Sequence, residues 1–327
     1  MSNFASFTKI TSFVPNLKKI DKIIFTILFS LSACVSFAQG ISIPVKEDGS
    51  VSRLRSDISA LCASRYAGRR SGTQAMAHVS EWIASRFASL GLIQAGADGW
   101  FQSFVLSDGG IGRNVIAKLE GTSGKYIVLA AHYDALGNSG GVLYPGANSN
   151  ASGVAAMFEI ARLLQGGNEP TGSYDGIIFV ALDAHFYSYM GAAAFVDALP
   201  SGKVRLVAVL DTIGASSTPV DVSRPRYLMA LGGEKYKSSF KRCASIARME
   251  IYYEYYRSES FTEMFHKRIG DQSVFVKSGF PTLVFTSGVT MDTNKPSDLP
   301  STIDYNALRY RCLFLSRWLN LTLRLTR

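Results

Sequence analysis

The feature that most constrains the fold is a set of continuous apolar runs of strand length. The runs at 126–134, 176–183 and 204–211 read YIVLAAHYD, GIIFVALD and VRLVAVLD. Strands that are apolar at nearly every position, rather than at every second one, are typical of a sheet covered on both faces. The sequence therefore predicts an internal sheet that helices bury from both sides.

Helical patterns between these runs supply the covering layers. Apolar residues recur at helical spacing at 75–91, 151–164 and 238–249, a shorter helix is expected near 191–199, and a terminal helix from about Tyr305. Further strands are predicted at 114–121 and 282–288. Strands that alternate with helices indicate an α/β fold with a mixed, largely parallel sheet.

Polar residues stand where the apolar runs end. His132, Asp183 and Asp211 each fall at the carboxyl end of one run, and the loop 145–150 precedes the helix predicted at 151–164. In an open α/β sheet the carboxyl ends of parallel strands converge on the crevice where ligands bind. A single Asp at a strand end is usually a turn former, but polar residues at the ends of three adjacent strands indicate a ligand-binding site.

The first 38 residues have the pattern of a signal peptide. A basic flank, NLKKIDK, precedes an apolar stretch that is short for a bilayer span, and small residues at Ser36 and Ala38 precede a cleavage point. Alternatively, Leu31 to Cys34 match a lipoprotein box, in which Cys34 would carry the lipid that anchors the protein to a membrane. We expect export, then a short lead-in (39–59) and a single domain (60–327).

Charge and cysteine content exclude some partners and leave other questions open. The formal net charge is +9, of which residues 1–38 carry +3, and the basic residues are scattered. This distribution argues against nucleic-acid binding. An exported chain would keep Cys62, Cys243 and Cys312, and their spacing does not decide which two would pair.

Segments along the whole region from about residue 60 resemble the co-catalytic zinc aminopeptidases, a family that also contains glutaminyl cyclases. The resemblance rests on motifs that occur in the family's order and spacing: YAGRRSGT, RNVIAKLEG, IVLAAHYDALG, YPGANSNASGVAAMFEIARLL, IIFVALDAHFYSYMGAAAF, AVLDTIG, GFPTLVFTSG and NKPSDLPSTIDY. The resemblance implies a three-layer α/β/α sandwich whose mixed sheet has about eight strands. It also implies a crevice that holds two zinc ions, with one carboxylate bridging them.

The resemblance assigns His132 to the first ligand position and Asp134 to the carboxylate that orients its imidazole. The bridging Asp belongs to a G-A-x-D-N-A-S-G loop, which here is Gly146 to Gly153 with Asn148 and Ser149 at its centre. Ser149 stands at the bridge position. A neutral hydroxyl cannot supply the charge that holds two dications together.

Two further ligand positions also lack a ligand. The family's D-G-E-E motif is here Asp183-Ala184-His185-Phe186, which puts His185 at the general-base position and Phe186 at a ligand position. The final H-x-x-x-D motif begins at Asn294 and ends at Asp298. Only Asp211 joins His132 as a retained ligand.

The altered positions predict a protein with the family's fold but without its metals. We expect a pseudopeptidase whose crevice, with Asn148, Asp183 and Asp298, binds a peptide, glycan or protein partner, and we expect no cofactor. Alternatively, His185 joins the two retained ligands in a mononuclear zinc hydrolase. A Ser149 nucleophile activated by His185 is a more remote alternative.

Overall fold

The computed structural model describes residues 49–167, 172–199, 202–216 and 226–324. The predicted signal peptide and Cys34 lie outside these residues. Within them, no helix combines the length and the apolar character that a membrane span requires.

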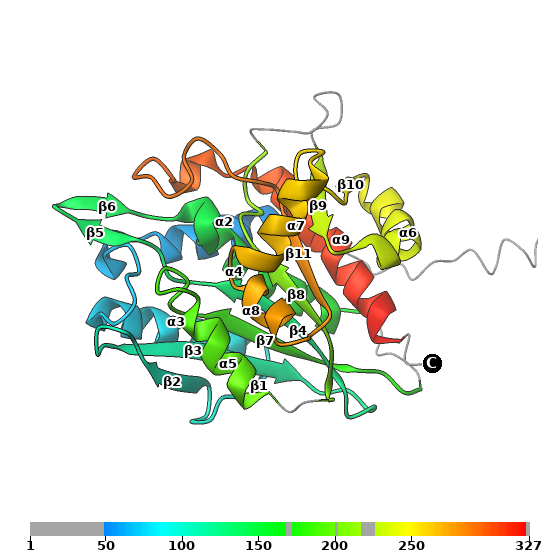
Figure 1. Ribbon diagram of the computed structural model, residues 1–327, viewed down its shortest axis with the longest axis horizontal. Coiled ribbons are helices and arrows are strands. Elements are labelled where there is room, and N and C mark those ends of the chain that lie inside the picture. Colours follow the sequence, from blue (N-terminus) through cyan, green and yellow to red (C-terminus); the bar gives the residue numbers. More distant parts are fainter. Residues whose placement is uncertain (1–48, 168–171, 200–201, 217–225, 325–327) are drawn as a thin grey trace, which may run out of the picture. The chain divides into compact units, whose positions relative to one another are not determined.

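The core is a nine-stranded mixed sheet with the strand order β1–β3–β7–β4–β8–β11–β9–β10, in which β2 also pairs with β3 (Figure 1). The central strands β7, β4, β8 and β11 run parallel, and β3 pairs antiparallel with β7. The strands are β1 (Ile93–Gln94), β2 (Phe101–Val105), β3 (Ile111–Leu119), β4 (Tyr126–His132), β7 (Gly176–Leu182), β8 (Val204–Leu210), β9 (Tyr227–Leu231), β10 (Glu250–Tyr252) and β11 (Thr282–Thr286).

Both faces of this sheet are buried, as the continuous apolar runs predicted. Along β4, Ile127 and Leu129 belong to the hydrophobic cluster on one face, whereas Val128 and Ala130 belong to the cluster on the other. Successive side chains of a strand point to opposite faces, so a strand buried on both sides must be apolar throughout. The predicted α/β/α sandwich is confirmed.

Helices α2, α3, α4, α6 and α9 cover the face that carries Ile127 and Leu129. The face that carries Val128 and Ala130 is covered by helices that include α5 and α8. The predicted helices at 75–91, 151–164, 191–199 and 238–249 and the terminal helix are confirmed within two residues at most ends. The helices are α2 (Ser50–Leu61), α3 (Gln74–Ser89), α4 (Ser152–Gln165), α5 (Met190–Ala198), α6 (Lys237–Ala247), α7 (Glu259–Arg268), α8 (Gln272–Lys277) and α9 (Tyr305–Leu323).

Helix α2 begins inside the expected lead-in (39–59) and ends at Leu61, in the expected domain. Its Leu54, Ile58 and Leu61 are buried in the main core. Glu159 of α4 accepts hydrogen bonds from Arg53 and from the hydroxyl of Ser50. Helix α2 therefore belongs to the folded domain.

The three cysteines of the described part are free thiols. Cys243 and Cys312 are buried, and Cys62 is partly buried with its Sγ 3.5 Å from the carbonyl oxygen of Pro145. None of them forms a disulfide with another described residue.

Candidate functional site

The ends of three neighbouring parallel strands bring the predicted polar residues together. His132 closes β4, Asp183 follows β7 and Asp211 follows β8. Because β4 pairs with both β7 and β8, these side chains converge at one edge of the sheet. The polar strand ends that the sequence pointed to therefore lie together.

His132 is held between two carboxylates. Its Nδ1 lies 3.2 Å from the carbonyl oxygen of Asp134 and 3.4 Å from that residue's carboxylate. Its Nε2 points toward Asp211, with 3.9 Å between Nε2 and Oδ1, and has no hydrogen-bond partner among the described residues. The ring is only 2% exposed. The orienting role that the resemblance gave to Asp134 fits this geometry.

A second buried carboxylate lies behind Asp134. Ser71 donates a hydrogen bond of 2.6 Å to Asp183, and its Oγ is 3.4 Å from Asp134. Burial and repulsion from Asp134 raise the pKa of Asp183 to about 7, although backbone amides of Arg113 and Ala184 oppose this. Asp183 is thus a completely buried carboxylate beside Asp134.

Asp134 remains the ionised member of this pair. Burial opposes its ionisation, yet the adjacent imidazoles of His132 and His185 and the amide of Phe186 lower the pKa of Asp134 below its usual value. Ser71, which links Asp134 to Asp183, lies within the YAGRRSGT segment, but sequence reasoning assigned it no role in the site.

His185 lies flat against His132. The two rings stack with centroids 4.0 Å apart and planes 18° apart. The Nδ1 of His185 is 2.8 Å from a carboxylate oxygen of Asp271, which is buried at the start of α8. Sequence reasoning missed Asp271, because it lies 86 residues beyond its partner and follows no strand.

The charge around His185 favours its protonated form. Burial by itself lowers the pKa of this imidazole, but attraction and hydrogen bonding from Asp271, with further attraction from Asp134 and Asp211, raise it to about 9. A protonated imidazole has no free lone pair with which to bind a metal. At neutral pH these interactions favour an imidazolium at 185 that pairs with Asp271.

Phe186 presents an apolar ring at a position where the family has a ligand. Its ring meets the ring of His185 edge-on at 5.0 Å and the ring of His132 edge-on at 6.0 Å. The ring of Tyr189 also packs edge-on against His185, with 5.1 Å between the centroids. Two other aromatic rings, those of Phe186 and Tyr189, therefore contact the stacked imidazoles.

Asp298 holds the backbone of the loop around Ser149 through hydrogen bonds. The carboxylate of Asp298 accepts hydrogen bonds from the amide of Asn148 at 2.7 Å and from the amide of Ser149 at 3.0 Å. The side chain of Asn148 in turn accepts from the amides of Gly214 and Ala215. The crevice residues Asn148 and Asp298 therefore support the loop.

The two other altered positions contact each other. The hydroxyl of Ser149 donates to the side-chain oxygen of Asn294 over 3.3 Å. Both groups are neutral, and each is a weaker zinc ligand than the carboxylate or imidazole of the family pattern. This bond also directs the Ser149 hydroxyl toward Asn294 and not toward His185, which is paired with Asp271.

The donors of this crevice do not fit a zinc site. Among the residues that the structure describes, no three His, Cys, Asp or Glu side chains are grouped so that they could hold one metal ion. His132 and Asp211 remain close to each other, but a zinc site needs at least three good ligands. Two imidazoles on one ion must point their nitrogens at a common point, and parallel stacked rings do not.

Comparison with known proteins agrees with the architecture. The sequence profile of peptidase family M28 matches residues 114–313, more than half of the chain. A zinc aminopeptidase from Bacillus subtilis has a similar fold, with a TM-score of 0.63 at 15% identity over 84% of this chain and 95% of that one.

Two further solved structures share this fold. A leucine aminopeptidase precursor from Bacteroides thetaiotaomicron gives a TM-score of 0.63 at 17% identity, over 88% of this chain and all of that chain. A glutaminyl cyclase from Porphyromonas gingivalis gives 0.61 at 18% identity, over 84% of this chain and 98% of that one. At such identities the likeness concerns the fold alone.

One curated relative is similar in sequence. The uncharacterized protein YfbL of Escherichia coli is 31% identical over 140 residues, which make up 41% of each chain. This chain therefore spans about two fifths of the length of the curated relative that it matches.

Proposed function

The chain belongs to peptidase family M28, and from this premise we propose that it is an exported pseudopeptidase. It keeps the family's crevice and uses it to bind a peptide, glycan or protein partner without hydrolysing it. The signal-peptide pattern of residues 1–38 supports export, with a lipid anchor on Cys34 as the alternative. The observation that carries the proposal is the contact between His185 and its two neighbours, His132 and Asp271.

This contact replaces metal ligation with an ion pair. The family pattern has a general-base Glu where His185 stands, and an anionic side chain there would face the carboxylates of Asp134 and Asp211. An imidazolium brings one positive charge to the same place, stacks on His132 at 4.0 Å and pairs with Asp271 at 2.8 Å. Buried carboxylates need a compensating cation, and here a side chain supplies it.

The remaining altered positions support the same proposal. A bridging carboxylate at 149 would lie next to the buried carboxylate of Asp298, which binds the amides of Asn148 and Ser149. Without dications, two carboxylates that close would repel each other. Serine avoids this repulsion and bonds to Asn294 instead. The substitutions at 149, 185, 186 and 294 are thus mutually compatible in a crevice without metal.

The mononuclear alternative requires the ring of His185 to leave its stacked position on His132. Its Nδ1 could keep the Asp271 carboxylate, but its Nε2 would have to turn until it converged with His132 Nε2 and Asp211 on one ion. The 3.9 Å between His132 Nε2 and Asp211 Oδ1 is the only part of such a centre already arranged among the described residues. The pseudopeptidase therefore has more support.

A comparison of the wild type with one variant tests whether the protein lacks hydrolytic activity. We would measure hydrolysis of a panel of aminoacyl-4-nitroanilides, with zinc added, by the wild type and by the His132→Ala variant. The proposal expects both to match the rate of buffer alone. Zinc-dependent hydrolysis by the wild type that His132→Ala abolishes would contradict it and favour the mononuclear hydrolase.

Binding without turnover is the second half of the proposal. Peptides with a free amino terminus are suitable probes because the family acts on peptides. We expect saturable binding in calorimetry that Asp211→Ala weakens, and intact peptide afterwards by mass spectrometry. A surface variant such as Ser59→Ala, on the exposed side of α2, serves as the matched control and should bind like the wild type.

A further inference from the structure

Helices α6 and α9 lie side by side on the sheet face that carries Ile127 and Leu129 (Figure 1). The ring of Phe240 on α6 packs against the rings of Phe314 and Trp318 on α9. The inner sides of both helices therefore belong to the main core, and their outer sides are neighbours.

The outer sides of these two helices carry positive charge without a carboxylate. The sequences of α6 (KSSFKRCASIA) and α9 (YNALRYRCLFLSRWLNLTL) contain lysine and arginine but neither aspartate nor glutamate. Lys241 and Arg242 are exposed on α6, and Arg317 is partly exposed on α9. Among the described residues, Nε and Nη1 of Arg317 have no hydrogen-bond partner. Neither helix thus neutralises its own charge.

Cations from both helices gather around the thiol of Cys243. Burial raises the pKa of this thiol, and the positive charges of Arg242 and Arg317 oppose that shift. A charge acts on a pKa in this way only when it lies near the titrating group. Basic residues that are scattered along the sequence are therefore brought together where α6 meets α9.

Aliphatic side chains stand among these cations. Ile246, one turn after Arg242 on α6, is 54% exposed. On α9, Leu313 and Leu321 are partly exposed, one turn before and one turn after Arg317. Residues four positions apart share a face of a helix, so each of these apolar side chains neighbours a cation. The α6–α9 surface is defined by Lys241, Arg242, Ile246, Leu313, Arg317 and Leu321.

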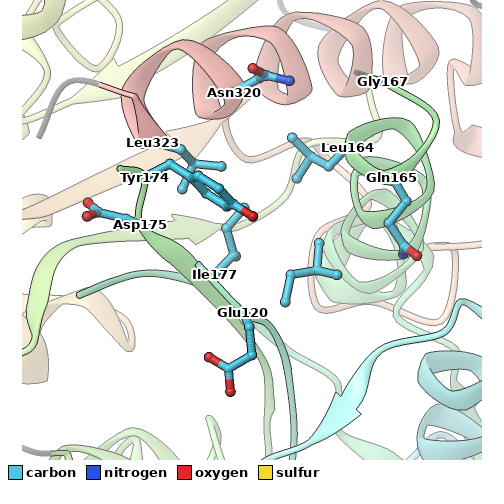
Figure 2. A pocket seen from close by; sticks show the side chains of 10 residues that line it. Glu120, Leu164, Gln165, Gly167, Tyr174, Asp175, Ile177, Asn320 and Leu323 are labelled. Carbon is cyan, nitrogen blue, oxygen red and sulfur yellow. The ribbon is translucent and has the colours of Figure 1, made fainter. Parts of the chain in front are cut away.

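The carboxylates near the end of α9 have other partners. Figure 2 shows a pocket of about 270 Å³ beside the last turns of α9, with Asp175 and Glu120 in its lining. Asp175 pairs with Arg205, and Glu120 pairs with Lys118. No residue of the α6–α9 surface lines this pocket. These two acidic side chains therefore leave the charge of the α6–α9 surface uncompensated.

We propose that the α6–α9 surface docks on a membrane that contains anionic phospholipids. Its cations lie among the lipid phosphates, and its aliphatic side chains enter the boundary of the acyl chains. The mixture of both kinds of side chain favours a bilayer, because an acidic polysaccharide offers phosphate-like charge but no apolar layer. This contact goes beyond the proposed function, since it uses none of the residues of the crevice.

Vesicle flotation tests this contact. The chain without residues 1–38, the form that export would leave, is suitable because its apolar leader cannot then bind the vesicles. We expect binding to vesicles of equal parts phosphatidylglycerol and phosphatidylcholine, and none to phosphatidylcholine alone. Binding should weaken as sodium chloride rises from about 0.05 M to about 0.5 M, because salt screens exposed charges.

A double variant, Lys241→Gln with Arg242→Gln, removes two exposed cations of the surface. Each cation near an anionic membrane strengthens binding about fivefold, so this variant should bind the anionic vesicles about 25-fold more weakly. Arg268→Gln with Lys277→Gln is the matched control, since it removes the same charge from exposed positions on α7 and α8. The control should bind like the wild type.

Ile246→Ser tests the apolar part of the surface without changing its charge. Loss of this exposed side chain from the acyl boundary should weaken vesicle binding about tenfold. Undiminished binding by Ile246→Ser would make the surface a site for polyanions in general and would overturn the bilayer contact. Equal binding to neutral and anionic vesicles, or equal weakening by the control pair, would also overturn it.

Discussion

The imidazole ring of His185 stacks on the ring of His132, with 4.0 Å between the centroids. His132 is a retained ligand position of the zinc aminopeptidase pattern, and His185 stands where that pattern has its general base. The same His185 pairs with Asp271 over 2.8 Å. The imidazole of His185, already paired with a carboxylate, thus lies against one of the two retained ligand positions.

The pairing with Asp271 should contribute to stability. Asp271→Asn leaves the buried imidazole without its counter-charge, so we expect the free energy of unfolding to fall by about 1–3 kcal/mol. Chemical denaturation measures this change. In His185→Phe, which keeps an aromatic ring on His132, the same Asp271→Asn change should cost much less. Equal costs in both backgrounds would show that the two residues are not coupled.

Asp298 closes the H-x-x-x-D motif without being one of its ligands, and it should matter for stability. Asp298→Ala removes the acceptor of two buried amides, those of Asn148 and Ser149, and should lower the free energy of unfolding by about 2–5 kcal/mol. Asp298→Asn retains one acceptor oxygen and should cost less than Asp298→Ala. Thermal unfolding of the two variants compares their losses of stability. Equal losses would mean that the Asp298 carboxylate does not hold the two amides.

The ion pairs of Glu159 should make stability depend on pH in the acid range. Burial opposes ionisation of Glu159, but hydrogen bonds from Arg53, Arg162 and Ser50 lower its pKa from 4.5 to about 2. Because the folded-state value is the lower one, the stabilisation is fully present above the unfolded value and is lost as the pH falls from about 4.5 toward 2. Its size is at most roughly 3 kcal/mol.

Glu159→Gln tests this dependence, since it removes the charge and keeps the shape. The difference in the free energy of unfolding between the wild type and Glu159→Gln should be largest near neutral pH and should shrink below pH of about 4.5. A difference that stays constant through the acid range would show that the carboxylate charge does not cause it.

Helix α2 should behave as part of the core. Ile58 is completely buried, so Ile58→Ala should lower the free energy of unfolding by about 2–4 kcal/mol. Ser59, the next residue, is exposed, and Ser59→Ala should change stability by less than about 0.5 kcal/mol. If Ile58→Ala were equally harmless, α2 would not be part of the folded domain.

The sequence predicted the sheet well because burial on both faces leaves an unambiguous pattern. Strands β4, β7 and β8 appear as continuous apolar runs, and their ends located His132, Asp183 and Asp211 together. Helix α2 was missed even though Leu54, Ile58 and Leu61 have helical spacing. Four serines and two arginines within it weakened that signal, and a stricter count of the spacing could have found it.

The partners of the site could not be predicted in the same way. Asp271 begins a short helix, and Ser71 lies in a loop before α3, so neither follows a strand of the sheet. Their contacts with His185 and Asp183 span 86 and 112 residues. Local patterns carry no information about such distant pairs, and only the folded chain brings them together.

Zinc content is the most direct test of the central claim, that this crevice has exchanged its metals for an ion pair. The mature chain would be incubated with excess zinc, dialysed and measured by mass spectrometry, beside a variant that combines Ser149→Asp, His185→Glu, Phe186→Glu and Asn294→His. We predict less than about a tenth of an equivalent in the wild type, and zinc in the variant, whose ligands are restored. A tightly held equivalent in the wild type that His185→Ala abolishes would contradict the claim.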